Sequence, residues 1–155
     1  MPDGRSLYMF NSYGTVILPL NPDGTATRVE TLPPMPDPRV RFQTPALSPD
    51  GKRFSGATGQ PEGNGVPGMW LYELETKRYE QLSADRGFYP QWLPDGKRML
   101  FLDNNGIAVI DVATKQIRPI PFGRKLRGFE ITPDAHALIL YERTAEADIW
   151  LVTGQ

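Results

Sequence analysis

The apolar positions of this chain come in short continuous runs that are separated by turn residues. Two such runs are residues 99–102 (Met-Leu-Phe-Leu) and 138–141 (Leu-Ile-Leu-Tyr), and neither has the spacing of three and four that marks an amphipathic helix. Short runs bounded by glycine, proline, asparagine and aspartate are typical of strands covered on both faces. The pattern therefore predicts an all-β protein of buried strands joined by tight turns.

The turns recur at similar distances along the chain. Pro-Asp-Gly followed by Arg or Lys occurs at 2–5, 49–52 and 94–97, and a degenerate Pro-Asp-Ala-His occurs at 133–136. The prolines are 47, 45 and 39 residues apart. In phase with these turns, residues 68–77 align without a gap on residues 106–115. A period of about 40 to 45 residues with four strands per unit indicates the blades of a β-propeller.

Each unit resolves into four antiparallel strands, a to d, with the Pro-Asp-Gly turn between a and b. The predicted strands are a at 42–47, 88–93 and 127–131; b at 5–10, 52–57, 97–102 and 136–141; c at 16–20, 69–74, 107–112 and 149–152; and d at 27–32, 79–82 and 116–120. The predicted fold is a single domain, 1–155, that forms a partial propeller of about 14 strands. Its blades span 1–32 (without strand a), 40–83, 88–120 and 126–155 (without strand d).

Two stretches resemble a known repeat. Residues 92–98 (Trp-Leu-Pro-Asp-Gly-Lys-Arg) and 148–151 (Asp-Ile-Trp-Leu) are similar to the WD40-like repeats of TolB-type β-propellers, and the similarity extends along the whole chain. The resemblance implies the propeller fold. Such repeats occur in periplasmic proteins of the Tol system and in C-terminal regions of bacterial sensor kinases and regulators, so it also implies a protein partner.

A half ring of blades leaves the apolar faces of its end blades in water, and an exposed apolar face is a signal for association. We expect one of two completions. Two chains related by a twofold axis form a homodimer with a ring of about eight blades, or the chain is the C-terminal half of a longer propeller protein.

The functional prediction is a non-catalytic scaffold that binds a protein or another ligand. Its alternative is the propeller part of a larger enzyme, such as the gating domain of a prolyl-oligopeptidase-like peptidase, or of a bacterial sensor kinase. A third interpretation is a relic half-propeller without an assigned activity. The chain has no Gly-x-Ser-x-Gly elbow, no HExxH motif and no phosphate-cradling glycine loop, so we expect no enzyme and no cofactor.

Composition narrows the range of partners. The 17 Lys and Arg residues and 18 Asp and Glu residues give a formal net charge of −1, which predicts neither non-specific nucleic-acid binding nor attachment to an anionic membrane. The chain has no cysteine, so disulfides, thiolate catalysis and thiolate-bound zinc are excluded. No apolar run is long enough for a membrane span, and residues 1–20 do not read as a secretory signal.

The longer connections of the repeat are its b–c and d–a loops, which share one face of a propeller. Loops that converge on one face are a common binding surface. The candidate binding residues on this face are Gln60, Glu62, Asn64, Arg86, Arg124, Lys125, Arg143 and Glu146.

Other residues have structural interpretations. Trp70, Trp92 and Trp150 lie within predicted strands and are expected in the core. His136, the only histidine, lies at a turn and is expected to be exposed. The aspartates of the recurring turns are expected to stabilise those turns, and no metal site is predicted.

Overall fold

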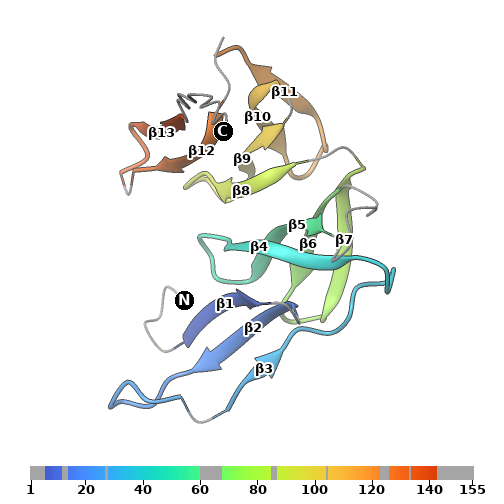
Figure 1. Cartoon of the computed structure of the whole chain (residues 1–155), viewed down its shortest axis with the longest axis vertical. Coiled ribbons are helices and arrows are strands. Elements are labelled where there is room, and N and C mark those ends of the chain that lie inside the picture. The colour runs from blue at the N-terminus through green and yellow to red at the C-terminus, as the bar shows by residue number, and fades with distance from the viewer. Residues whose placement is uncertain are drawn as a thin grey trace, which may run out of the picture.

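The structure, a computed structural model, describes residues 6–11, 14–26, 28–59, 68–84, 87–103, 105–122, 126–132 and 134–142. Within these ranges it has 13 strands in four antiparallel sheets, and no helix. Figure 1 shows the sheets following one another along an arc, with strands β1, β4, β8 and β12 nearest its concave side. The sheets are blade 1 (β1 Ser6–Asn11, β2 Gly14–Pro19, β3 Glu30–Thr31), blade 2 (β4 Arg41–Leu47, β5 Arg53–Gly59, β6 Met69–Glu73, β7 Arg78–Ser83), blade 3 (β8 Phe88–Trp92, β9 Arg98–Asp103, β10 Gly106–Asp111, β11 Ile117–Ile120) and blade 4 (β12 Leu126–Ile131, β13 Leu138–Glu142).

The prediction of a partial propeller built from four-stranded antiparallel blades is confirmed. Blades 2 and 3 are complete four-stranded meanders, in which every strand pairs with its neighbours in the chain. The predicted strand at 149–152 lies outside the described residues, and so do residues 1–5 of predicted blade 1 and residues 143–155 of predicted blade 4.

One strand is shorter than expected. The prediction placed a strand at 27–32, whereas β3 has only two residues. A further Pro-Asp-Gly, at 22–24, occupies the c–d connection of blade 1, where Gly24 has a φ of +81° and its N–H donates to the Asn21 carbonyl at 2.9 Å. This turn makes a local bridge between Leu20 and Ala26, out of register with the pairs of β2 and β3, so the regular ladder begins only at Glu30.

The turn aspartates have the structural role expected of them. In blade 2, the Asp50 carboxylate accepts hydrogen bonds from the Ser48 hydroxyl (2.6 Å) and the Lys52 N–H (3.1 Å), and these bonds hold the pKa of Asp50 below its usual value. In blade 4, Asp134 accepts from Thr132 and from the N–H of His136, with the same effect on its pKa. His136 is exposed, as predicted. Asp3 lies outside the described residues.

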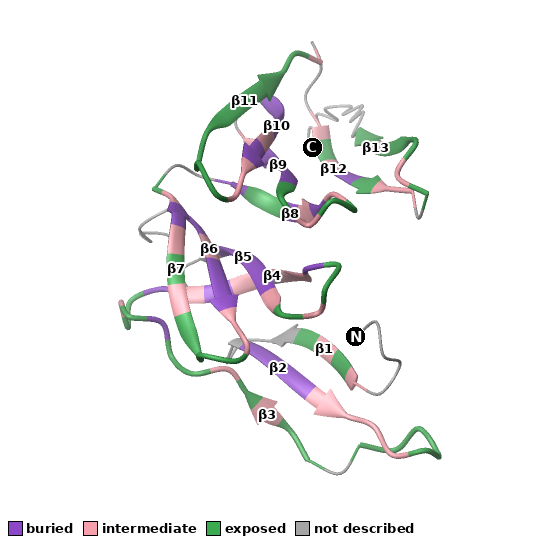
Figure 2. Cartoon of the chain, turned by 180° about the vertical axis from the view of Figure 1, so that it is seen from behind, coloured by how far each residue is buried: buried purple, intermediate pink, exposed green. Residues whose placement is uncertain are grey.

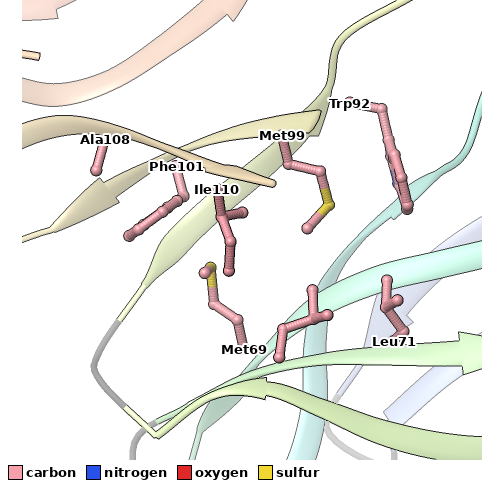
Figure 3. Packing of buried hydrophobic residues seen from close by; sticks show 8 residues of the cluster. Met69, Leu71, Trp92, Met99, Phe101, Ala108 and Ile110 are labelled. Carbon is pink, nitrogen blue, oxygen red and sulfur yellow. The ribbon is translucent and has the colours of Figure 1, made fainter. Parts of the chain in front are cut away.

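The hydrophobic core is divided into three clusters, and each lies between two adjacent blades. The central cluster joins Met69, Leu71 and Leu82 of blade 2 to residues of β8, β9 and β10 in blade 3, and Figure 3 shows their side chains interdigitating across the interface. A second cluster joins blades 1 and 2, and a third joins blades 3 and 4. Strands of the inner blades are apolar on both faces because each face meets a neighbouring sheet.

The tryptophans follow the prediction as far as they are described. Trp92 is buried in the central cluster, and Trp70 packs, partly buried, against the cluster between blades 1 and 2. Trp150 lies outside the described residues. Across the described ranges the structure contains no helix long and apolar enough to cross a membrane.

Candidate functional site

An open hollow of about 620 Å³ lies where the innermost strands of the blades converge. Its wall comes from all four sheets: β4, β8 and β12 contribute with the turns that follow them, and β1 contributes one tyrosine. In Figure 1 these strands border the concave side of the arc. The lining residues are Tyr8, Pro45, Ala46, Leu47, Pro49, Tyr89, Pro90, Gln91, Trp92, Pro94, Ile131, Thr132 and Ala135.

Proline recurs on the wall for a reason of backbone chemistry. Pro45 of β4 and Pro90 of β8 each stand four positions before the proline of the following turn, so they are equivalent in the repeat. Each lies where the strand shifts register against its neighbour, between Gln43 and Ala46 in blade 2 and between Phe88 and Gln91 in blade 3. Proline has no N–H to donate, so it suits the unpaired positions of an edge strand at a bulge.

Tyr89 is held in an unusual backbone conformation at the edge of the hollow. Its φ is +52°, in the left-handed region, and it precedes a proline, a position that normally favours extended backbone. Such a conformation in a bulky residue costs about 1–3 kcal/mol and is concentrated at functional sites. The side chain is half exposed. The bulge therefore presents an accessible aromatic ring to the hollow.

Two other polar side chains on the wall join the blades to each other. Gln91 donates from Nε2 to the Phe129 carbonyl (2.7 Å) and accepts at Oε1 from the Ile131 N–H (3.0 Å), so it links β8 to the backbone of β12. Trp92 donates from Nε1 to the Ala46 carbonyl of β4 (3.1 Å). These groups fix the shape of the wall, which leaves Tyr89 and Tyr8 as the aromatic groups most able to contact a ligand.

The described wall of the central hollow is uncharged. None of the described residues that line it is acidic, basic or a histidine. In the part of the chain that the structure describes, no group of three or more His, Cys, Asp and Glu side chains could hold a metal ion. The described wall offers aromatic rings, proline rings and a few hydroxyl groups, which suit binding of an apolar or extended ligand.

A second hollow, of about 880 Å³, lies between blades 2 and 3 and is lined by residues of β5, β6, β7 and β10 and of the turns beside them. Its lining carries charges of both signs, and several are already engaged. The Arg53 guanidinium lies 5.0 Å from the centre of the Trp92 ring and donates to the Gly96 carbonyl. Burial raises the pKa of Tyr79, whose hydroxyl donates to the Pro33 carbonyl at 2.7 Å. We therefore regard this second hollow as a blade junction and the central hollow as the candidate site.

The candidate residues predicted from the sequence are not tested by the structure. All eight, Gln60, Glu62, Asn64, Arg86, Arg124, Lys125, Arg143 and Glu146, lie outside the described residues. They were assigned to the face of the b–c and d–a loops, whereas the central hollow lies beside the a–b turns that contain Pro49 and Pro94. Sequence reasoning did not find Tyr89. The available signal was the proline that recurs at the same place in two blades.

The comparisons with known proteins agree on the fold. No protein-family model and no curated protein matches the sequence. TolB from Acinetobacter baumannii superposes with a TM-score of 0.66 at 19% identity, over 95% of this chain and 37% of that one. Oligogalacturonate lyase from Vibrio parahaemolyticus superposes with a TM-score of 0.67 at 14% identity, over 88% and 43%. Dipeptidyl peptidase 4 from Porphyromonas gingivalis gives 0.55 at 17% identity, over 83% and 20%.

The sheets, the interblade cores and these likenesses together define a partial β-propeller. Within that class the fold is TolB-like, as the repeats at 92–98 and 148–151 implied. The chain spans less than half the length of each of the three proteins, and identities below 20% carry the fold and nothing further.

Proposed function

We propose that this chain is a non-catalytic binding scaffold whose central hollow receives an extended, uncharged peptide segment of a protein partner. The observation that supports this function is the composition of the wall. Tyr89 and Tyr8 face it together with four prolines, and no charged side chain is among its described residues. Grooves lined by aromatic rings bind proline-rich segments, because such segments are already extended and lose little conformational entropy on binding.

Tyr89 is the residue on which binding should depend most. Aromatic side chains that fill the centre of an interface are frequent hot spots, and removing one commonly costs more than about 2 kcal/mol, a loss of roughly 30-fold in affinity. Its neighbour Phe88 is exposed to a similar degree but does not line the hollow. The two side chains thus provide a matched pair, one inside the proposed site and one beside it.

The test is titration of the chain with a decaproline peptide, followed by calorimetry. We expect saturable binding that Tyr89→Ala weakens at least tenfold and that Phe88→Ala leaves unchanged. We also expect little dependence on salt, because none of the described residues that line the hollow is charged. Equal binding to the two variants, or no binding of decaproline at concentrations of the order of 1 mM, would refute the proposal.

The second candidate function is the propeller part of a larger enzyme. The likenesses that include a lyase and a peptidase favour it at the level of the fold, and the chain spans only 43% and 20% of those two proteins. In that case the hollow is a passage or gate beside a separate catalytic domain. Identification of a coding region for a hydrolase or kinase domain continuous with this chain would support the second candidate over the first.

A further inference from the structure

The two ends of the arc expose apolar residues at positions that the inner blades bury. Alignment on the Pro-Asp-Gly turns places Leu7 and Met9 of β1 at the positions of Met99 and Phe101 in β9. Met99 and Phe101 are 0% and 2% exposed because they pack against the preceding blade, whereas Leu7 and Met9 are 57% and 53% exposed.

The other end of the arc exposes apolar residues at positions that, in an inner blade, face the following blade. The same alignment places Ile139 and Tyr141 of β13 at the positions of Leu100 and Leu102. Those two leucines are buried against the following blade, but Ile139 and Tyr141 are 50% and 44% exposed. Figure 2 shows exposed residues along β1 and β13, while β5, β6, β9 and β10 of the inner blades are largely buried.

These residues form two different faces. The leading face, Leu7 and Met9, is of the kind that packs on a preceding blade. The trailing face, Ile139 and Tyr141, is of the kind that packs on a following blade. A trailing face and a leading face already meet inside the chain, where Leu100 and Leu102 pack with Phe129 and Leu140 of blade 4. A second copy of this chain carries both faces on one arc.

We propose that two copies of the chain associate so that the leading face of each covers the trailing face of the other. A twofold axis forms both junctions at once, and the pair is then closed to further addition. A carboxylate beside the trailing face, that of Glu130, accepts a hydrogen bond from the Tyr141 hydroxyl, and this bond raises the pKa of that hydroxyl. Within β1 no residue is charged.

The experiment is light scattering after size exclusion across a hundredfold dilution from about 100 µM. In this range a dimer of micromolar affinity dissociates, whereas a tighter dimer keeps its mass. We expect the wild-type chain to have twice the mass of one chain. Met9→Glu and Ile139→Glu each place a charge in both junctions and should yield monomers with unchanged circular dichroism. Ile117→Glu is the matched control, because Ile117 is exposed on the outermost strand of an inner blade. It should stay dimeric.

A rescue variant tests which surfaces meet. Met9→Lys combined with Ile139→Glu places opposite charges on the leading and trailing faces, so the double variant should regain the dimer mass that Ile139→Glu alone loses, and high salt should weaken it. A folded wild-type monomer throughout the dilution would overturn the proposal. Loss of the dimer in Ile117→Glu, retention of the dimer in both Glu variants, or a ladder of species larger than two chains would also overturn it.

Discussion

The Gln91 side chain joins blade 3 to blade 4, and substituting it tests whether these hydrogen bonds stabilise the wall of the hollow. Its amide donates one hydrogen bond to the β12 backbone and accepts another. A hydrogen bond inside a protein contributes about 0.5–1.5 kcal/mol, so Gln91→Ala should weaken the junction by about 2 kcal/mol. Since that free energy corresponds to roughly 30-fold, the Ile131 amide should exchange with deuterium roughly 30-fold faster, with little change at Phe101 in the central cluster.

Gln91→Glu separates the two bonds. The new carboxylate still accepts from the Ile131 N–H, but it faces the Phe129 carbonyl with a second acceptor, so the pKa of the new carboxyl is raised in the folded state. The stabilising contribution of the protonated form is therefore fully present below about pH 4.3, the pKa of an unfolded glutamate, and is lost as the pH rises through the raised value. Equal exchange at Ile131 in the wild type and Gln91→Ala, or a Gln91→Glu variant that does not recover at low pH, would refute the reasoning.

Three further predictions concern stability. Ala135 has a φ of +56° at the turn position where blades 2 and 3 have glycine, so Ala135→Gly should stabilise blade 4 by about 0.5–1 kcal/mol in urea titration; destabilisation would contradict this. A Cβ on Gly56 would lie 2.7 Å from the ring of Phe42, so Gly56→Ala should destabilise by about 1–3 kcal/mol, although alanine is ordinarily preferred within a strand. Hydrogen bonds from Arg39 lower the pKa of Asp37 to about 2, so the stability they provide is present above pH 3.8 and is lost as the pH falls towards 2. Asp37→Asn should flatten that part of the acid-unfolding curve, and an unchanged curve would show that the pair contributes nothing.

The strands of the inner blades could be predicted because the apolar runs and the turn residues between them indicate the same strand boundaries. Residues 97–102 and 107–112 were predicted as adjacent strands, and β9 and β10 pair there, with Gly106 opposite Asp103 at the hairpin. The prediction was less accurate in blade 1. Pro22-Asp23-Gly24 forms a turn between strands c and d, and the bridge beside this turn is out of register with β2 and β3, so only two residues of the strand predicted at 27–32 form β3.

The wall of the hollow could not be predicted in the same way. A tyrosine before a proline is expected to be extended, and nothing local in the sequence indicates the left-handed φ of Tyr89. That conformation depends on the bulge of β8 against β9, which is set by pairing along the whole sheet. The Gln91 bridge depends on the distance between two blades, and a pattern within one repeat does not contain that distance. The eight loop residues predicted to bind a partner stay a prediction.

The division of the core into three interblade clusters determines how the molecule should lose its structure. Each cluster joins only two adjacent sheets, so the free energy of unfolding is close to a sum of nearest-neighbour contributions, as in other repeat proteins. Blade 4 is held by one such cluster and two described strands, and it should open before the centre of the arc in sub-global unfolding. In a closed ring every blade has two neighbours, and the transition would change from fraying at the ends to a single cooperative step.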